Sequence, residues 1–169
     1  MLKKFKFFIR SSRAKDIASL LNEATEVCDT LTSNELAALE IKNYVYNAKE
    51  AVEDLGLDEA LVNELVEDYV DQIVKSITQF ESYLETLQES QDNELTLDYV
   101  PFRELAHKNL GVARNLRIKD AEKLLYELMK KDDLEYLLTC LEALKVCAIK
   151  LKPARAFDTL KLIKVKNSL

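Results

Sequence analysis

Hydrophobic residues recur along almost the whole chain at the three- and four-residue spacing that places side chains on one face of an α-helix. The clearest stripe follows Asp58 and consists of Leu61, Val62, Leu65, Val66, Tyr69, Val70, Ile73, Ile77, Phe80, Leu84 and Leu87. Only two glycines and two prolines interrupt the pattern, and this scarcity disfavours a sheet-rich or turn-rich fold. The sequence therefore predicts an all-α protein.

Breaks in the periodicity predict where the first helices begin and end. We expect a helix over about residues 14–31 and a second from Leu36 to Gly56, because glycine commonly follows the last turn of a helix. Asp58 can cap a long third helix over residues 59–87. The polar run 88–94 that follows is the longest predicted loop.

Three further helices are predicted in the second half of the chain. Asp98 and Pro101 indicate the start of a helix that contains His107, since proline suits the first turn. Helices over 118–131 and 134–151 follow, joined by a short turn. Because helices joined by short loops pack as antiparallel neighbours, we expect an antiparallel up-down four-helix bundle. The predicted division is an N-terminal helical extension (1–49), the bundle (50–152) and a basic C-terminal tail (153–169).

The charge of the chain is distributed unevenly over its 169 residues. Residues 1–15 carry six basic side chains and no acid, a charge of +6, and residues 152–169 carry five basic and one acidic, a charge of +4. Because the net charge of the whole chain is −6, the residues between these ends carry −16. An acidic middle disfavours nucleic-acid binding. No stretch approaches the roughly 20 apolar residues of a membrane span, and the apolar part of residues 1–13 is too short for a secretory signal. We therefore expect a cytoplasmic protein.

The three cysteines, Cys28, Cys140 and Cys147, form no CxxC pair. An odd number of cysteines without framework spacing indicates a reducing compartment and buried thiols. We interpret all three as core residues.

His107 is the only histidine of the chain. At 100° per residue, the side of its helix opposite His107 carries the mostly apolar set Phe102, Leu105, Asn109, Val112, Ala113 and Leu116. The residues within about 60° of His107 are Arg103, Glu104, Leu110, Gly111 and Arg114. His107 is therefore expected in the middle of a solvent-exposed face, where it is either functional or an incidental surface residue.

Gly111 lies one turn beyond His107 on the same face. A glycine in the middle of a helix costs about 1 kcal/mol relative to alanine. The close approach of another molecule could offset that cost, and close packing of a neighbouring helix is the alternative. Arg103, Lys108 and Arg114 would place positive charge around His107, which favours an anionic group there.

The segment around His107 resembles the histidine phosphotransfer (Hpt) domain family of two-component phosphorelays. The family pattern is roughly A-H-x-L-K-G-x-A, and the sequence reads AHKNLGVA over residues 106–113. Residues 57–69 are similar to the family's first bundle helix, and the two helices after Leu116 fall where the family has its last two. The resemblance covers about residues 50–151. Leu110 stands where the family has a lysine, Asn109 where it has a hydrophobic residue, and Arg117 where it has a later glycine.

The resemblance implies a phosphocarrier without autokinase activity. His107 would be the phosphorylated nucleophile, exchanging a phosphoryl group with the aspartate of a response-regulator receiver domain or a hybrid histidine kinase. Gly111, Arg103, Lys108, Arg114 and Glu104 would bind the phosphoryl group or the partner, and we expect Leu110 to be an apolar docking contact. No cofactor is expected on this chain, because the receiver supplies the Mg²⁺.

Two other functions are compatible with parts of the sequence. The departures at residues 109, 110 and 117 favour a non-catalytic helical adaptor that docks a signalling partner. Glu104 and His107 have the Glu-x-x-His spacing of di-iron bundles, but those sites require two such motifs, so no metal site is expected. The helices of residues 1–49 could either pair with a second copy to form a homodimer or cover the end of the bundle.

Overall fold

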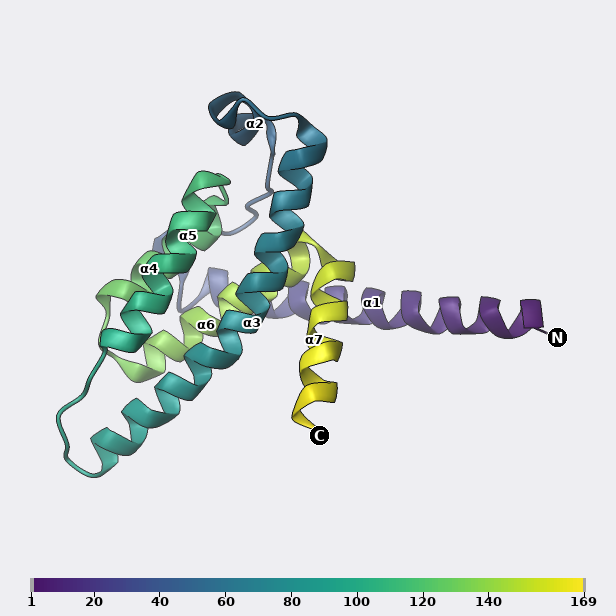
Figure 1. Cartoon of the computed structure of the whole chain (residues 1–169). Helices are drawn as coiled ribbons and strands as arrows, with labels where there is room; N and C mark the ends of the chain where they lie inside the picture. Colours follow the sequence, from purple (N-terminus) through teal and green to yellow (C-terminus); the bar gives the residue numbers. More distant parts are fainter. Residues whose placement is uncertain (1, 169) are drawn as a thin grey trace.

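The computed structural model describes the backbone of residues 2–168 and the side chains of residues 12–168 (Figure 1). Within that span the chain is entirely helical, with seven α-helices, one short 3₁₀ helix and no strand. The α-helices are α1 (Leu2–Ser33), α2 (Lys49–Leu55), α3 (Glu59–Asp92), α4 (Val100–Asn115), α5 (Lys119–Lys130), α6 (Leu134–Leu151) and α7 (Pro153–Asn167). The 3₁₀ helix η1 spans Ala37–Leu39.

Helices α3, α4, α5 and α6 form a closed ring of neighbours. Helix α3 packs against α4 and α6, and α5 packs against the same two helices. Helix α1 lies across α6, and its N-terminal part extends beyond the other helices (Figure 1). None of the helices in the described part of the chain is long and apolar enough to cross a membrane.

The core fills the interior of this ring and continues to buried residues of α1, α2 and α7. Its largest fully buried side chains include Phe80 from α3 and Phe102 from α4, whose rings meet edge to face with centroids 5.1 Å apart. Aromatic pairs favour this arrangement because the positive edge of one ring faces the negative face of the other. The pair therefore links α3 to the helix that carries His107.

Most predicted helices are confirmed, with shifted ends. Asp58 caps α3 by accepting a hydrogen bond from the Leu61 amide at 2.8 Å, and α3 continues to Asp92, five residues beyond its predicted end. Its last turns are polar and therefore lack the hydrophobic signal on which the prediction relied. Helix α6 has the predicted bounds, and its cap Asp133 accepts hydrogen bonds from two amides of the first turn.

The prediction of one helix from Leu36 to Gly56 is wrong. Only η1 and α2 are helical there, and Glu40 and Asn43 adopt left-handed backbone conformations that end regular helix. The hydroxyl of Tyr46 donates to the Leu116 carbonyl at 2.8 Å, and that of Tyr44 donates to the Arg117 carbonyl at 3.2 Å. Contacts with the end of α4 therefore hold this segment in a non-helical path.

The basic residues after Pro153 form helix α7, which packs against α3, α6 and α1. The Thr159 hydroxyl donates to Asp71 of α3 at 2.8 Å. Both carboxylate oxygens of Asp158 accept hydrogen bonds from Arg13 of α1 at 2.9 Å. The C-terminal segment is thus a docked helix that also contacts the N-terminal extension.

Candidate functional site

Helix α4 begins and ends with local contacts that the sequence supplies. The Asp98 carboxylate accepts a hydrogen bond from the Val100 amide at 3.0 Å, and Pro101 occupies the first turn. The Tyr99 hydroxyl donates to the Asp132 carbonyl at 2.6 Å, which ties the start of α4 to the turn between α5 and α6. These contacts set the position of the helix two turns before His107.

The C-terminal end of α4 is closed by a left-handed residue, Arg117, with φ of 59°. The Ile118 amide donates to the Ala113 carbonyl at 3.0 Å, and the Arg117 amide donates to the Arg114 carbonyl at 3.1 Å. This pair of bonds is the Schellman motif, in which glycine is the usual left-handed residue. The Arg117 guanidinium contacts Asp54 at 2.9 Å, an ion pair that glycine could not form.

The buried face of α4 consists of Phe102, Ala106, Asn109, Leu110 and Ala113. Leu110 is 4% exposed, so the expectation that it is a docking contact on the His107 face is wrong. Helix α4 packs against both α3 and α5, and a helix with two neighbours buries a wider arc than a helix with one. Leu110 lies at the edge of that arc.

Asn109 lies at the centre of a buried polar cluster between α3 and α4. Its side-chain amide donates to the Ser76 hydroxyl at 3.2 Å and to the Leu105 carbonyl at 2.9 Å. Its carbonyl oxygen accepts a hydrogen bond from Gln72 at 3.3 Å. Because buried amides require partners, this cluster selects one rotation of α4, the one in which His107 faces solvent.

Replacement of Asn109 by alanine is expected to lower the free energy of unfolding by about 2 kcal/mol, because the buried Ser76 loses its partner across the helix interface. Urea denaturation monitored by circular dichroism measures the loss. Asn115→Ala is the matched control, since Asn115 is exposed on the same helix and its loss should change stability by less than about 0.5 kcal/mol. Equal effects of the two substitutions would contradict a structural role for the cluster.

His107 is exposed, as predicted, and lies at a shallow depression on the outside of the helical ring. The depression has a volume of about 490 Å³ and is lined by His107 together with Val100, Arg103, Glu104 and Met129. Val100 is 59% exposed and adds apolar surface beside the imidazole. Neither Val100 nor Met129 was predicted from the sequence, and Met129 comes from α5, so only tertiary packing brings it to His107.

The three predicted cations are placed differently around His107. The Arg103 guanidinium lies over the Tyr99 ring, 4.8 Å from its centroid, and also lines the depression. Arg114 forms an ion pair with Glu122 of α5 at 3.6 Å, so the carboxylate of Glu122 offsets part of its positive charge. Lys108 is exposed. Arg103 is therefore the basic residue that the structure places beside the histidine.

Gly111 is exposed, and a Cβ atom added to it would meet no atom within 4 Å. Close packing of a neighbouring helix therefore does not explain this glycine. The open space leaves the backbone of α4 accessible one turn after His107.

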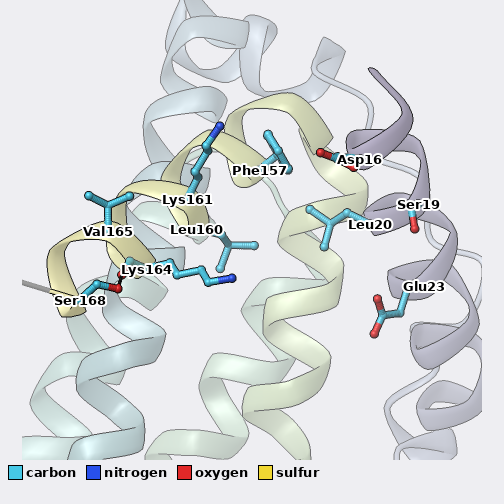
Figure 2. Close-up of a pocket in the computed structure, with 10 residues that line it drawn as sticks. All are labelled: Asp16, Ser19, Leu20, Glu23, Phe157, Leu160, Lys161, Lys164, Val165 and Ser168. Atoms are coloured by element: carbon cyan, nitrogen blue, oxygen red, sulfur yellow. Dashed lines mark hydrogen bonds between the residues drawn. The ribbon is translucent and has the colours of Figure 1, made fainter. Parts of the chain in front are cut away.

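A second hollow, which the sequence analysis did not predict, lies between α1 and α7. It is a groove of about 720 Å³ lined by Asp16, Ser19, Leu20, Glu23, Phe157, Leu160, Lys161, Lys164, Val165 and Ser168 (Figure 2). Acidic residues line the α1 side and lysines line the α7 side. The groove is separate from the His107 depression, with which it shares no residue.

Neither hollow has the donor set of a metal site. Among the residues that the structure describes, no group of three or more histidine, cysteine, aspartate or glutamate side chains could hold a metal ion. Glu104 and His107 both line the depression, but no second Glu-x-x-His pair accompanies them in the sequence. Comparison of the chain with protein-family models, with curated proteins and with solved structures finds no match.

Proposed function

We propose that the chain is a histidine phosphotransfer protein, with His107 as the residue that carries the phosphoryl group. The observation that carries the proposal is an exposed histidine in mid-helix, followed one turn later by a glycine with open space around it. A receiver domain must bring its phospho-aspartate into line with an imidazole nitrogen, and a protruding side chain at residue 111 would obstruct that approach. An exposed imidazole on a rigid helix meets this requirement.

The arrangement of helices supports the same proposal. The closed ring of α3, α4, α5 and α6 is the contact pattern expected of an Hpt-like four-helix bundle, with short connections between successive helices from α4 onwards. His107 lies on the outside of the ring and Asn109 and Phe102 lie inside it. In this proposal the imidazole attacks the phosphorus of a phospho-aspartate, and the receiver's Mg²⁺ stabilises the charge on the transferred group.

Phosphotransfer itself is the direct test. The purified chain is mixed with receiver domains of the same organism that carry labelled phospho-aspartate, and label on the chain is measured by electrophoresis. The proposal expects label that acid removes and base does not, as for phosphohistidine. Absence of label from every receiver, while binding remains detectable, would overturn it.

A non-catalytic adaptor is the second candidate, and the position of Leu110 favours it. The Hpt pattern has a lysine at this position, whereas Leu110 is buried and provides no charge near His107. Arg103 is the basic group closest to fulfilling that role, because it lines the same depression. An adaptor should show any effect of Arg103→Gln in partner binding alone, whereas a phosphocarrier should transfer more slowly with that variant.

Replacement of Gly111 by alanine is expected to raise the free energy of unfolding by about 1 kcal/mol, because alanine favours the helix and has room for its Cβ. The same substitution should slow phosphotransfer, since the methyl group occupies the space that the receiver approaches. Denaturation and transfer rates measured on one preparation test both effects.

Gly56→Ala is the matched control for this pair of measurements. A Cβ added to Gly56 would also meet no atom within 4 Å, but the φ of this residue is +65°. Because alanine disfavours that backbone conformation, Gly56→Ala should lower the free energy of unfolding by about 1 kcal/mol. It should leave transfer unchanged. Faster transfer with Gly111→Ala would contradict a role of the open space in partner approach.

A further inference from the structure

Two of the three cysteines are in contact between α1 and α6. The sulfur of Cys28 lies 4.0 Å from the sulfur of Cys147, although 119 residues separate them in the chain. Helix α1 packs against α6, so this contact lies within the interface that holds the N-terminal extension. Both cysteines were predicted to be core residues, and both are buried.

Charged groups surround this pair within the interface. The Lys150 ammonium donates to the Cys28 sulfur at 3.8 Å. The hydrogen bond shared with Cys147, followed by the charge of Lys150, lowers the pKa of Cys28 to about 7, against the opposing effects of burial, Asp120 and Asp29. The same hydrogen bond, burial and the negative charge of Asp120 raise the pKa of Cys147. These surroundings favour the thiolate form of Cys28 and the protonated form of Cys147.

We propose that Cys28 and Cys147 form a peroxide-reactive dithiol, which oxidises to a disulfide that joins α1 to α6. The Cys28 thiolate attacks one oxygen of hydrogen peroxide, and an S–O bond forms as the O–O bond breaks. Sulfur is oxidised to sulfenic acid, and the departing hydroxide takes up the proton that the Cys28 thiol released, giving water.

In the second step the Cys147 sulfur attacks the sulfenic sulfur of Cys28. The S–S bond forms, the S–O bond breaks, and the leaving hydroxide takes the Cys147 thiol proton, giving a second water. Two thiols and one peroxide thus become one disulfide and two waters. The sulfurs must approach by about 2 Å to reach bonding distance, and nothing lies between two sulfur atoms already in contact.

The third cysteine provides an internal comparison. Cys140 lies on α6, is 0% exposed, and burial raises its pKa to about 12. Cys28 and Cys147 are 5% and 8% exposed as residues, so both lie nearer to the surface than Cys140. Reactivity follows thiolate character and access, so oxidation should spare Cys140.

The test uses the full chain, treated with hydrogen peroxide and then alkylated under denaturing conditions. We expect two of three thiols to be lost, a linked peptide pair containing Cys28 and Cys147 in mass spectrometry, and a rise in Tm of roughly 10 °C that dithiothreitol reverses. Cys140→Ala should behave as the wild type, and Cys147→Ser should form no disulfide.

Peptide mapping of the wild type does not depend on whether any variant folds. Three free thiols after peroxide treatment of the folded chain would overturn the proposal. So would a linked pair that includes Cys140, or oxidation that stops at sulfenic acid on Cys28. The outcome is independent of phosphotransfer, because His107 and the thiol pair lie on different helices and neither cysteine lines the His107 depression.

Discussion

Replacement of His107 by glutamine is expected to abolish phosphoryl transfer to the chain while leaving its stability unchanged. Glutamine has no nucleophilic nitrogen that can accept a phosphoryl group, so labelling should fall by on the order of 10³-fold or more, to the background of the assay. Because His107 is exposed, its replacement should change the free energy of unfolding by less than about 0.5 kcal/mol.

Transfer from a labelled receiver and urea denaturation, measured on the same preparations, test both parts of this prediction. Asn115→Ala is the control, since it changes an exposed residue of α4 away from the depression and should keep wild-type transfer. The biological role of His107→Gln separates the two candidate functions, because an adaptor should keep both its binding and its role, whereas a phosphocarrier should lose its role while keeping its fold. Acid-labile label on His107→Gln would show that another residue carries the phosphoryl group.

Replacement of Phe102 by alanine is expected to cost about 3–5 kcal/mol of stability, the largest effect predicted for a single residue here. Phe102 is fully buried and its ring packs edge to face against Phe80. Truncation removes that contact and leaves a cavity between α3 and α4 that the surrounding helices can fill only in part. Since typical domains have a total stability of about 5–15 kcal/mol, a large share of the stability would be lost.

Chemical denaturation monitored by circular dichroism measures the effect, with Phe157→Ala as the matched control. Phe157 is only half-buried and lines the groove between α1 and α7, so its truncation should cost less than half as much. If the two substitutions cost the same, Phe102 would not be a central core residue. Phosphotransfer by Phe102→Ala should fall only in proportion to the unfolded fraction.

Much of the secondary structure could be predicted because its causes are local. The stripe from Leu61 to Leu87, the cap at Asp58 and the turn at Asp133 are all defined by residues within one or two turns of each other, and the structure confirms α3 and α6 on these signals. Residues 36–56 have a comparable apolar pattern but are not one helix. Tyr44 and Tyr46 reach the end of α4 instead, and no local rule indicates that contact.

The candidate site also has some features that the sequence predicted and others that depend on tertiary packing. The exposure of His107 and the burial of Asn109 follow from their angular positions on one helix, and both are confirmed. The placement of Leu110 is wrong because a second neighbouring helix widened the buried arc. The Schellman geometry of Arg117 explains why a glycine would suit that position, and its ion pair with Asp54 explains what arginine contributes instead.

By itself, the sequence of this protein determined that the chain is helical, roughly where most of its helices lie, and which way its single histidine faces. These properties depend on periodicity and capping, which act over a few residues. Only the tertiary structure decided that Met129 lies beside His107, that Asn109 joins Ser76, and that Cys28 meets Cys147. Each of these contacts joins residues from different helices, and their positions depend on how whole helices pack rather than on local pattern.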